Sequence, residues 1–151
     1  MTPSTASTIG LADLTLLVGR LLLALIFVHE GAVLALHLDA TVKTMAALGI
    51  GLPLVLAIIA LQLGAGFSVG LGLLTRLGAI ALGLFCLATA ALFHTNFASQ
   101  NELLHFEKDL AISGGMFVLA VMGAGALSLD ALLDRSPLWQ RGPWRSITAH
   151  P

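Results

Sequence analysis

The sequence is poor in charge and in cysteine, and each shortage excludes a class of protein. Charged residues make up 10% of the chain and hydrophobic residues 58%, far from the composition of a soluble domain. The few Lys and Arg residues form no basic block, which excludes nucleic acid as a partner. Cys86 is the only cysteine, so the chain cannot form an internal disulfide or a paired-thiol redox centre. Residues 1–12 contain no Lys or Arg, so we expect no cleavable signal peptide and a first apolar segment that is retained.

Long uncharged runs dominate the rest of the chain, at 44–75, 77–101 and 110–129. Each run is long enough to cross a hydrocarbon core of about 30 Å as a helix. Lipid accepts only helices or closed barrels, and continuous apolar runs favour helices. We therefore predict an all-α, integral membrane four-helix bundle formed by residues 1–130. Its spans are expected at about 11–36, 52–74, 77–97 and 110–127, with Gly49, Gly51 and Pro53 marking the start of the second.

The cationic residues beside the spans predict the orientation. Four spans return both termini to one side of the membrane, and short cytoplasmic loops accumulate Lys and Arg. One side would carry Arg76, Arg135, Arg141 and Arg145, and the other Lys43 and Lys108 among acidic residues. Both termini are therefore predicted to be cytoplasmic. Residues 131–151, with Trp139 and Trp144 between arginines, are expected to form a short interfacial tail at the cytoplasmic headgroups.

Polar side chains gather in the outer half of the predicted bundle. They are His29, Glu30 and His37 late in the first span, His94 and Asn96 late in the third, and Glu102, His105 and Glu107 in the loop that follows. An ionisable group inside a span costs roughly 3 kcal/mol at mid-bilayer and tends to mark function. Arg20, Glu30 and His94 are accordingly the candidate catalytic groups.

The residues leave several interpretations of these groups open. His29 and His94 on facing helices could ligate haem, although their spacing is not a metal signature and we predict no metal site. A quinone head group could be contacted by His94, Glu30 or Arg20, since such a site needs apolar walls and a few hydrogen-bonding groups. The histidines could equally form interhelical hydrogen bonds, and Arg20 could clamp helix carbonyls. Gln62 is typical of interhelical hydrogen bonding, and the spacing of Gly66 and Gly70 favours close packing within the bundle.

One stretch of the sequence resembles a known family. It runs from Gly72-Leu-Leu-Thr-Arg76 through Phe93-His94, Phe106-Glu-Lys-Asp109, Ile112-Ser-Gly-Gly115 and Gly123-Ala-Gly125 to Leu127-Ser-Leu-Asp130, and with Arg20 and Phe27 to Gly31 it is similar to the DoxX family of small bacterial membrane proteins. The resemblance implies a four-helix membrane fold and a place near redox systems, such as a thiosulfate:quinone oxidoreductase subunit or partners of thiol- and superoxide-handling proteins. The positions that match the family pattern are Arg20, Gly31, Gly72, Thr75, Arg76, His94, Lys108, Gly114, Gly115, Ser128 and Asp130.

Two departures from the pattern shape the functional hypothesis. Gln62 stands where members usually have a glutamate, and apolar Val33-Leu34 replaces a lysine often found after the first-helix glycine. The loss of an acid and a base favours a non-catalytic accessory subunit of a bacterial inner-membrane redox or respiratory complex, with lipid and other membrane subunits as partners. The alternatives are a quinone-reactive subunit of an oxidoreductase of the thiosulfate:quinone type and a small ligand-binding or transport protein.

Overall fold

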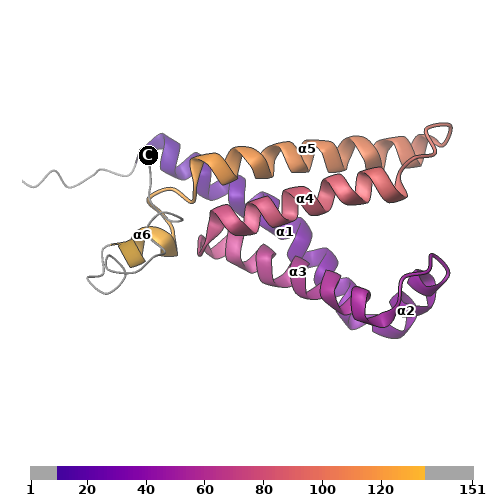
Figure 1. Ribbon diagram of the computed structural model, residues 1–151. Helices are drawn as coiled ribbons and strands as arrows, with labels where there is room; N and C mark the ends of the chain where they lie inside the picture. The colour runs from indigo at the N-terminus through magenta and orange to yellow at the C-terminus, as the bar shows by residue number, and fades with distance from the viewer. Residues whose placement is uncertain (1–9, 135–151) are drawn as a thin grey trace, which may run out of the picture.

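The computed structural model describes residues 10–134, which form six helices. They are α1 (Leu11–Leu36), α2 (Leu38–Ala46), α3 (Leu52–Leu71), α4 (Thr75–Phe93), α5 (Gln100–Met122) and α6 (Leu129–Asp134). Helix α1 packs along α3, and α4 packs along α5 (Figure 1). The two pairs meet near the α3–α4 turn and diverge toward the end that holds α2 and the α4–α5 loop. The bundle is therefore a wedge, closed at one end and open at the other.

Within residues 10–134, three helices are long and apolar enough to cross a membrane: α1, α3 and α4. The all-α prediction is confirmed, and α1 has the predicted bounds. Helix α3 ends three residues earlier than expected, because Gly72 adopts a left-handed conformation with φ of 73° and its N–H donates back to the Val69 carbonyl at 3.1 Å. Helix α4 runs over Thr75–Phe93 instead of 77–97, so His94 caps its end and Asn96 lies in the loop.

The last long helix differs most from the prediction. Helix α5 begins at Gln100, ten residues before the expected span, so Glu102, His105 and Glu107 are helical and do not lie in a loop. Glu102 lies in the first turn, where the positive end of the helix dipole stabilises an acidic side chain. The helix ends at Met122, before Gly123. After Asp109 its apolar part spans about 20 Å at 1.5 Å per residue.

The segment between α1 and α3 also contains a helix. His37 ends α1, and α2 follows at once over Leu38–Ala46. The buried hydroxyl of Thr41 donates to the Leu34 carbonyl at 3.3 Å, which ties α2 to the end of α1. The apolar side of α2 packs through Val42 and Met45 against a cluster at the start of α3, and this packing holds α2 at the open end, beside α1 and α3.

The described chain begins and ends at the closed end of the wedge (Figure 1). The Ala126 N–H donates to Asp13 Oδ1 at 3.0 Å, which joins the α5–α6 segment to the first turn of α1. The predicted interfacial tail lies mostly outside the described residues, as do Arg135, Trp139, Arg141, Trp144 and Arg145. Arg76 lies just after the α3–α4 turn at the closed end, whereas Lys43 lies on α2 at the open end.

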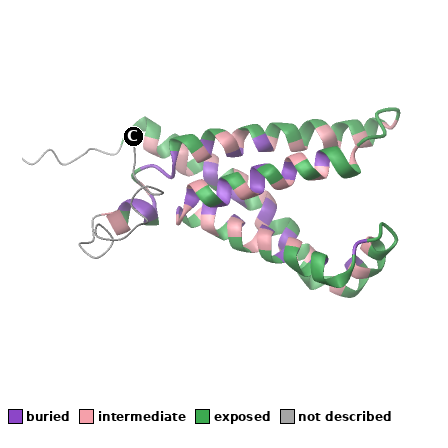
Figure 2. Ribbon diagram, viewed as in Figure 1, coloured by how far each residue is buried: buried purple, intermediate pink, exposed green. Residues whose placement is uncertain are grey.

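Buried residues concentrate where the helices converge, and the outward faces are exposed and apolar (Figure 2). Glycines allow the close approach that this core requires. A methyl at Gly66 would lie 3.0 Å from Val28 of α1, and one at Gly83 would lie 3.0 Å from Phe117 of α5. The prediction that these small residues close the protein's own bundle is therefore confirmed for Gly66, and for Gly70, which faces Ala24.

Candidate functional site

Arg20 lies at the closed end, where it binds backbone and no cavity. Its side chain is only 3% exposed, and the guanidinium donates to the carbonyls of Gly70 at 3.3 Å, Ala124 at 2.6 Å and Leu127 at 2.5 Å. These carbonyls belong to the end of α3 and to the segment between α5 and α6. Binding of helix carbonyls was one of the roles considered for this arginine from the sequence, and the observed geometry agrees with that role.

Asp130 completes the same structure from the other side. Its carboxylate accepts hydrogen bonds from the N–H groups of Leu74 at 2.8 Å and Thr75 at 3.2 Å, and so caps the start of α4. Its own N–H donates to the Gly72 carbonyl at 2.8 Å. A methyl at Gly72 would lie 2.6 Å from Cβ of Ser128 and 2.7 Å from Arg20. We call Arg20, Gly72, Thr75, Ser128 and Asp130 the basal clamp.

The remaining family-pattern residues are not part of the basal clamp. Gly31 lets α1 approach α3, since a methyl there would lie 3.0 Å from Leu63. Gly115 faces Leu23 of α1, whereas a methyl at Gly114 would meet open space. Arg76 is half-buried, and Lys108 is exposed with its ammonium 3.3 Å from Nδ1 of His105.

A cavity of about 590 Å³ opens between the two helix pairs, on the side of the wedge away from the basal clamp. Its walls are mostly apolar and include Ile26, Phe27, Ile58, Phe85 and Phe93, with Met45, Leu48 and Ile50 at the α2 end. Its polar residues come from α1, α3, α4 and α5 and from the residue that caps α4. They are Glu30, Gln62, Thr89, His94, Glu102, Lys108 and Asp109.

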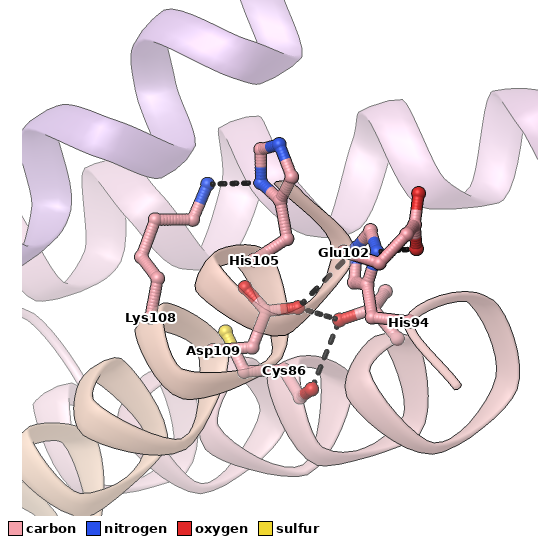
Figure 3. A network of polar contacts seen from close by, with 7 residues as sticks. Cys86, His94, Glu102, His105, Lys108 and Asp109 are labelled. Atoms are coloured by element: carbon pink, nitrogen blue, oxygen red, sulfur yellow. Dashed lines mark hydrogen bonds and ion pairs between the residues drawn. The ribbon is translucent and has the colours of Figure 1, made fainter. Parts of the chain in front are cut away.

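His94 lies at the centre of a polar network along one wall (Figure 3). Its Nδ1 is 3.0 Å from Oε2 of Glu102, and its Nε2 is 4.0 Å from Oδ2 of Asp109. The Thr89 hydroxyl lies 2.9 Å from both that Asp109 oxygen and the Cys86 carbonyl, so it can donate to one at a time. The His105 ring stacks on His94 with 5.1 Å between centroids. The imidazole, at the end of α4, is thus oriented by three groups of α5.

Gln62 supplies a different kind of polar atom. Its side chain is 6% exposed, and its Oε1 has no hydrogen-bond partner among the described residues. The expected interhelical hydrogen bond is therefore not made by this oxygen. A buried amide oxygen without a donor costs about 1–3 kcal/mol.

The structure divides the predicted site residues into two groups. Glu30 and His94 line the cavity, whereas Arg20 belongs to the basal clamp. The His29 side chain is 68% exposed, lies 3.8 Å from Glu30 and is absent from the cavity wall, so the proposed pairing of His29 with His94 is not assembled there. His37 is exposed at the α1–α2 junction. Over residues 10–134, no group of three or more His, Cys, Asp or Glu side chains could hold a metal ion.

Sequence reasoning missed Thr89 and Asp109 as site residues. A helical signal was present: Glu102, His105 and Asp109 are spaced i, i+3 and i+7, which places them on one helix face. Because the last span was expected to begin at residue 110, residues 102–109 were assigned to a loop, and their helical spacing was not considered. The two departures from the family pattern also meet here, because both Gln62 and Leu34 line the cavity.

Comparisons with known proteins identify the class. The DoxX family model matches residues 15–95, which cover α1 to α4. Inner membrane protein YqjF of Escherichia coli (strain K12) is 38% identical over 125 residues, covering 83% of this chain and 96% of that protein. Inner membrane protein YphA of the same strain is 35% identical over 122 residues, covering 76% and 87%. No solved structure matches. The chain belongs to the DoxX family and is a multi-pass inner membrane protein.

Proposed function

We propose that this protein binds a quinone-type ligand in the cavity and serves a redox complex of the inner membrane. The observation that carries the proposal is a 590 Å³ space with apolar walls and a few convergent polar groups. Ligand sites of roughly 300–1,000 Å³ have this composition. The apolar walls suit the ring and isoprenoid chain of a quinone, and the polar network suits its two oxygens.

His94 is the residue we assign to the ligand's head group. Glu102 and Asp109 hold the imidazole from two directions, and Glu30 lies on α1 across the wedge. A quinone takes up two electrons and two protons when it becomes a quinol. In this proposal the carboxylates and the imidazole exchange the protons, and a partner subunit exchanges the electrons.

We further propose that α5 is the fourth span and that the basal clamp faces the cytoplasm. Arg76 lies at the closed end and Lys43 at the open end, which is the distribution that the positive-inside rule favours. The apolar part of α5 is shorter than a full span. Its charged first turns therefore lie at the outer membrane surface and beside the cavity, where water and ligand compensate them.

A second candidate function is that of a non-catalytic accessory subunit, as the departures from the family pattern favour. The basal clamp supports it, because five family-pattern residues there fix the backbone and contact no cavity. In this version the fold is a scaffold that docks against a redox enzyme.

Binding of decylubiquinone to the purified protein in lipid nanodiscs tests the first proposal. We expect saturable binding that His94→Ala weakens at least about tenfold, because the variant removes the hydrogen bond to the head group. His29→Ala is the matched control, since it removes an exposed imidazole that does not line the cavity. Equal weakening by both variants, or no saturable binding, would refute the quinone site.

Mass spectrometry of the proteins that copurify with the tagged chain after mild-detergent extraction tests the second candidate. Stoichiometric recovery of an oxidoreductase without decylubiquinone binding supports an accessory subunit. Recovery of the chain alone, with binding, supports a self-contained site and contradicts a place in a redox complex.

A further inference from the structure

We infer that Asp109 is the residue of the cavity wall that binds and releases a proton, and that Thr89 is the positioning residue that keeps its carboxyl group hydrogen-bonded in both states. The inference rests on the proposed function for the destination of the proton, which is then one of the two that a quinone and its quinol exchange. The proton site itself is carried by the geometry of three oxygen atoms between α4 and α5.

The Thr89 hydroxyl lies between two acceptors. Its oxygen is 2.9 Å from the Cys86 carbonyl oxygen and 2.9 Å from Oδ2 of Asp109. The hydroxyl has one hydrogen to donate, so one of these two short contacts has no hydrogen when Asp109 is ionised. A proton on Oδ2 supplies the second hydrogen. Asp109 then donates to Thr89, Thr89 donates to the Cys86 carbonyl, and all three oxygens are paired.

The same hydroxyl also serves the ionised state. It then turns and donates to Oδ2, because a hydrogen bond to a charged acceptor is the stronger one. The Cys86 carbonyl does not depend on Thr89, since it lies inside α4, where the N–H four residues further along is its regular partner. The carboxyl group can therefore gain and lose a proton without the cost of about 1–3 kcal/mol that an unpaired buried polar group carries.

His94 connects Asp109 to a more exposed carboxylate (Figure 3). The side chains of Glu102, His94 and Asp109 are 32%, 24% and 13% exposed, so exposure falls along this series. Glu102 is 3.0 Å from Nδ1 of the imidazole, and Oδ2 of Asp109 is 4.0 Å from Nε2. An imidazole can accept a proton on one nitrogen and release one from the other. The 4.0 Å contact is longer than a hydrogen bond, as contacts between catalytic groups often are before a ligand binds.

The other titratable side chains near Asp109 come from three elements, and the described parts of α2 and α3 add none to the cavity wall. They are Cys86 and His94 at α4, Glu102, His105 and Lys108 on α5, and Glu30 on α1. A proton on His94, between the two carboxylates, is the main alternative. In that case Asp109 stays ionised and Thr89 continues to donate to it, so the two placements of the proton differ in the direction of the Thr89 hydroxyl.

Infrared spectroscopy of the full-length protein in lipid nanodiscs reports that direction through a single carbonyl. Cys86 is the only cysteine, so 1-¹³C-cysteine labels one backbone carbonyl, the acceptor beside Thr89. Acidification from neutral pH without ligand should shift the amide I band of this carbonyl to lower wavenumber, because the hydroxyl turns toward it when Asp109 binds a proton. A carboxyl C=O band that Asp109→Asn removes should appear with the same midpoint.

Two substitutions at Thr89 separate its role in positioning from a role in packing. Thr89→Ser keeps the hydroxyl and should keep the shift of the Cys86 band. Thr89→Val keeps nearly the same shape without the hydroxyl and should abolish the shift. Asp109→Asn should abolish the pH dependence, since an amide does not titrate. Asp39→Asn, on the exposed side of α2, is the control and should leave the shift unchanged.

The outcomes separate this inference from the proposed function. A Cys86 band that does not move on acidification, or that moves equally in Thr89→Val, overturns the inference. Imidazole bands that report protonation of His94 without a shift of the Cys86 band assign the proton to the histidine and also overturn it. Binding of decylubiquinone to the same sample is measured separately. A Cys86 shift without quinone binding keeps the proton site and overturns the quinone site, and quinone binding without the shift does the reverse.

Discussion

Removal of Asp130 is the sharpest test of the basal clamp. The carboxylate is 4% exposed and is the acceptor for the first two N–H groups beside the α3–α4 turn, those of Leu74 and Thr75. These N–H groups lie at the start of α4, where a helix has no intrahelical acceptors to offer. Asp130 also interacts electrostatically with Arg20 in the same buried region. Asp130→Ala should therefore destabilise the whole closed end.

The magnitude follows from the two interactions that are lost. Loss of an N-cap side chain costs about 0.5–2 kcal/mol. The attraction between Asp130 and Arg20 is also lost, but they form no ion pair within 4.0 Å among the described residues, and Arg20 keeps its three carbonyl acceptors. This loss therefore adds less than the roughly 3–5 kcal/mol of a broken buried charge pair. We expect a total of about 3 kcal/mol for Asp130→Ala. Asp130→Asn, which keeps one acceptor oxygen, should cost about half as much.

The single cysteine provides the assay. Cys86 is 3% exposed and belongs to the core, although it also meets the cavity wall, so a fluorogenic maleimide reacts with it much faster when the bundle opens. At roughly 2–4 °C per kcal/mol for a chain of this size, the midpoint of thiol exposure should fall by about 9 °C for Asp130→Ala. Asp39→Ala, on the exposed side of α2, is the control and should leave the midpoint unchanged. A shift of the clamp variant that is no larger than that of the control would refute the clamp.

Three further predictions follow from other parts of the structure. Gly72→Ala forces a methyl against Ser128 at a φ of 73° and should cost at least about 2 kcal/mol by the same thiol assay. In intact cells, a membrane-impermeant maleimide should label Lys43→Cys and spare Arg76→Cys, and the reverse pattern would invert the proposed topology. Gln62→Glu alone should destabilise the protein by burying a carboxylate, whereas addition of Leu34→Lys should recover about 1–2 kcal/mol, and strictly additive effects would show that the two positions do not couple across the cavity.

The sequence predicts the apolar helices well, because in lipid the length of an apolar run is enough to indicate a spanning helix. The bounds of α1 agree with the prediction, and α3 and α4 differ from it by two to four residues at their ends. The two helices end early because Gly72 and His94 cap them. Helix α5 was misplaced by ten residues at its start because its first turns are polar, and hydropathy carries no signal for a polar helix beside a membrane.

The candidate site could be predicted only in part. Glu30 and His94 stood out because ionisable groups are rare in spans, and both line the cavity. The role of Arg20 depends on carbonyls 50, 104 and 107 residues away along the chain, which no local pattern reveals. The cavity itself arises where two helix pairs that are distant in sequence diverge, and no local pattern reveals that arrangement.

The basal clamp and the cavity use separate sets of residues, and this separation limits what family membership implies. The clamp holds Arg20, Gly72 and Asp130, which are positions that match the family pattern and fix the backbone. The cavity holds Gln62 and Leu34, which are positions where this chain departs from it, together with His94 and Lys108, which match it. Because a fold and the site built on it can change independently, the match of the clamp to the family pattern supports the fold of this chain and does not identify its ligand. The chemistry of this protein is therefore to be inferred from the residues that line its own cavity.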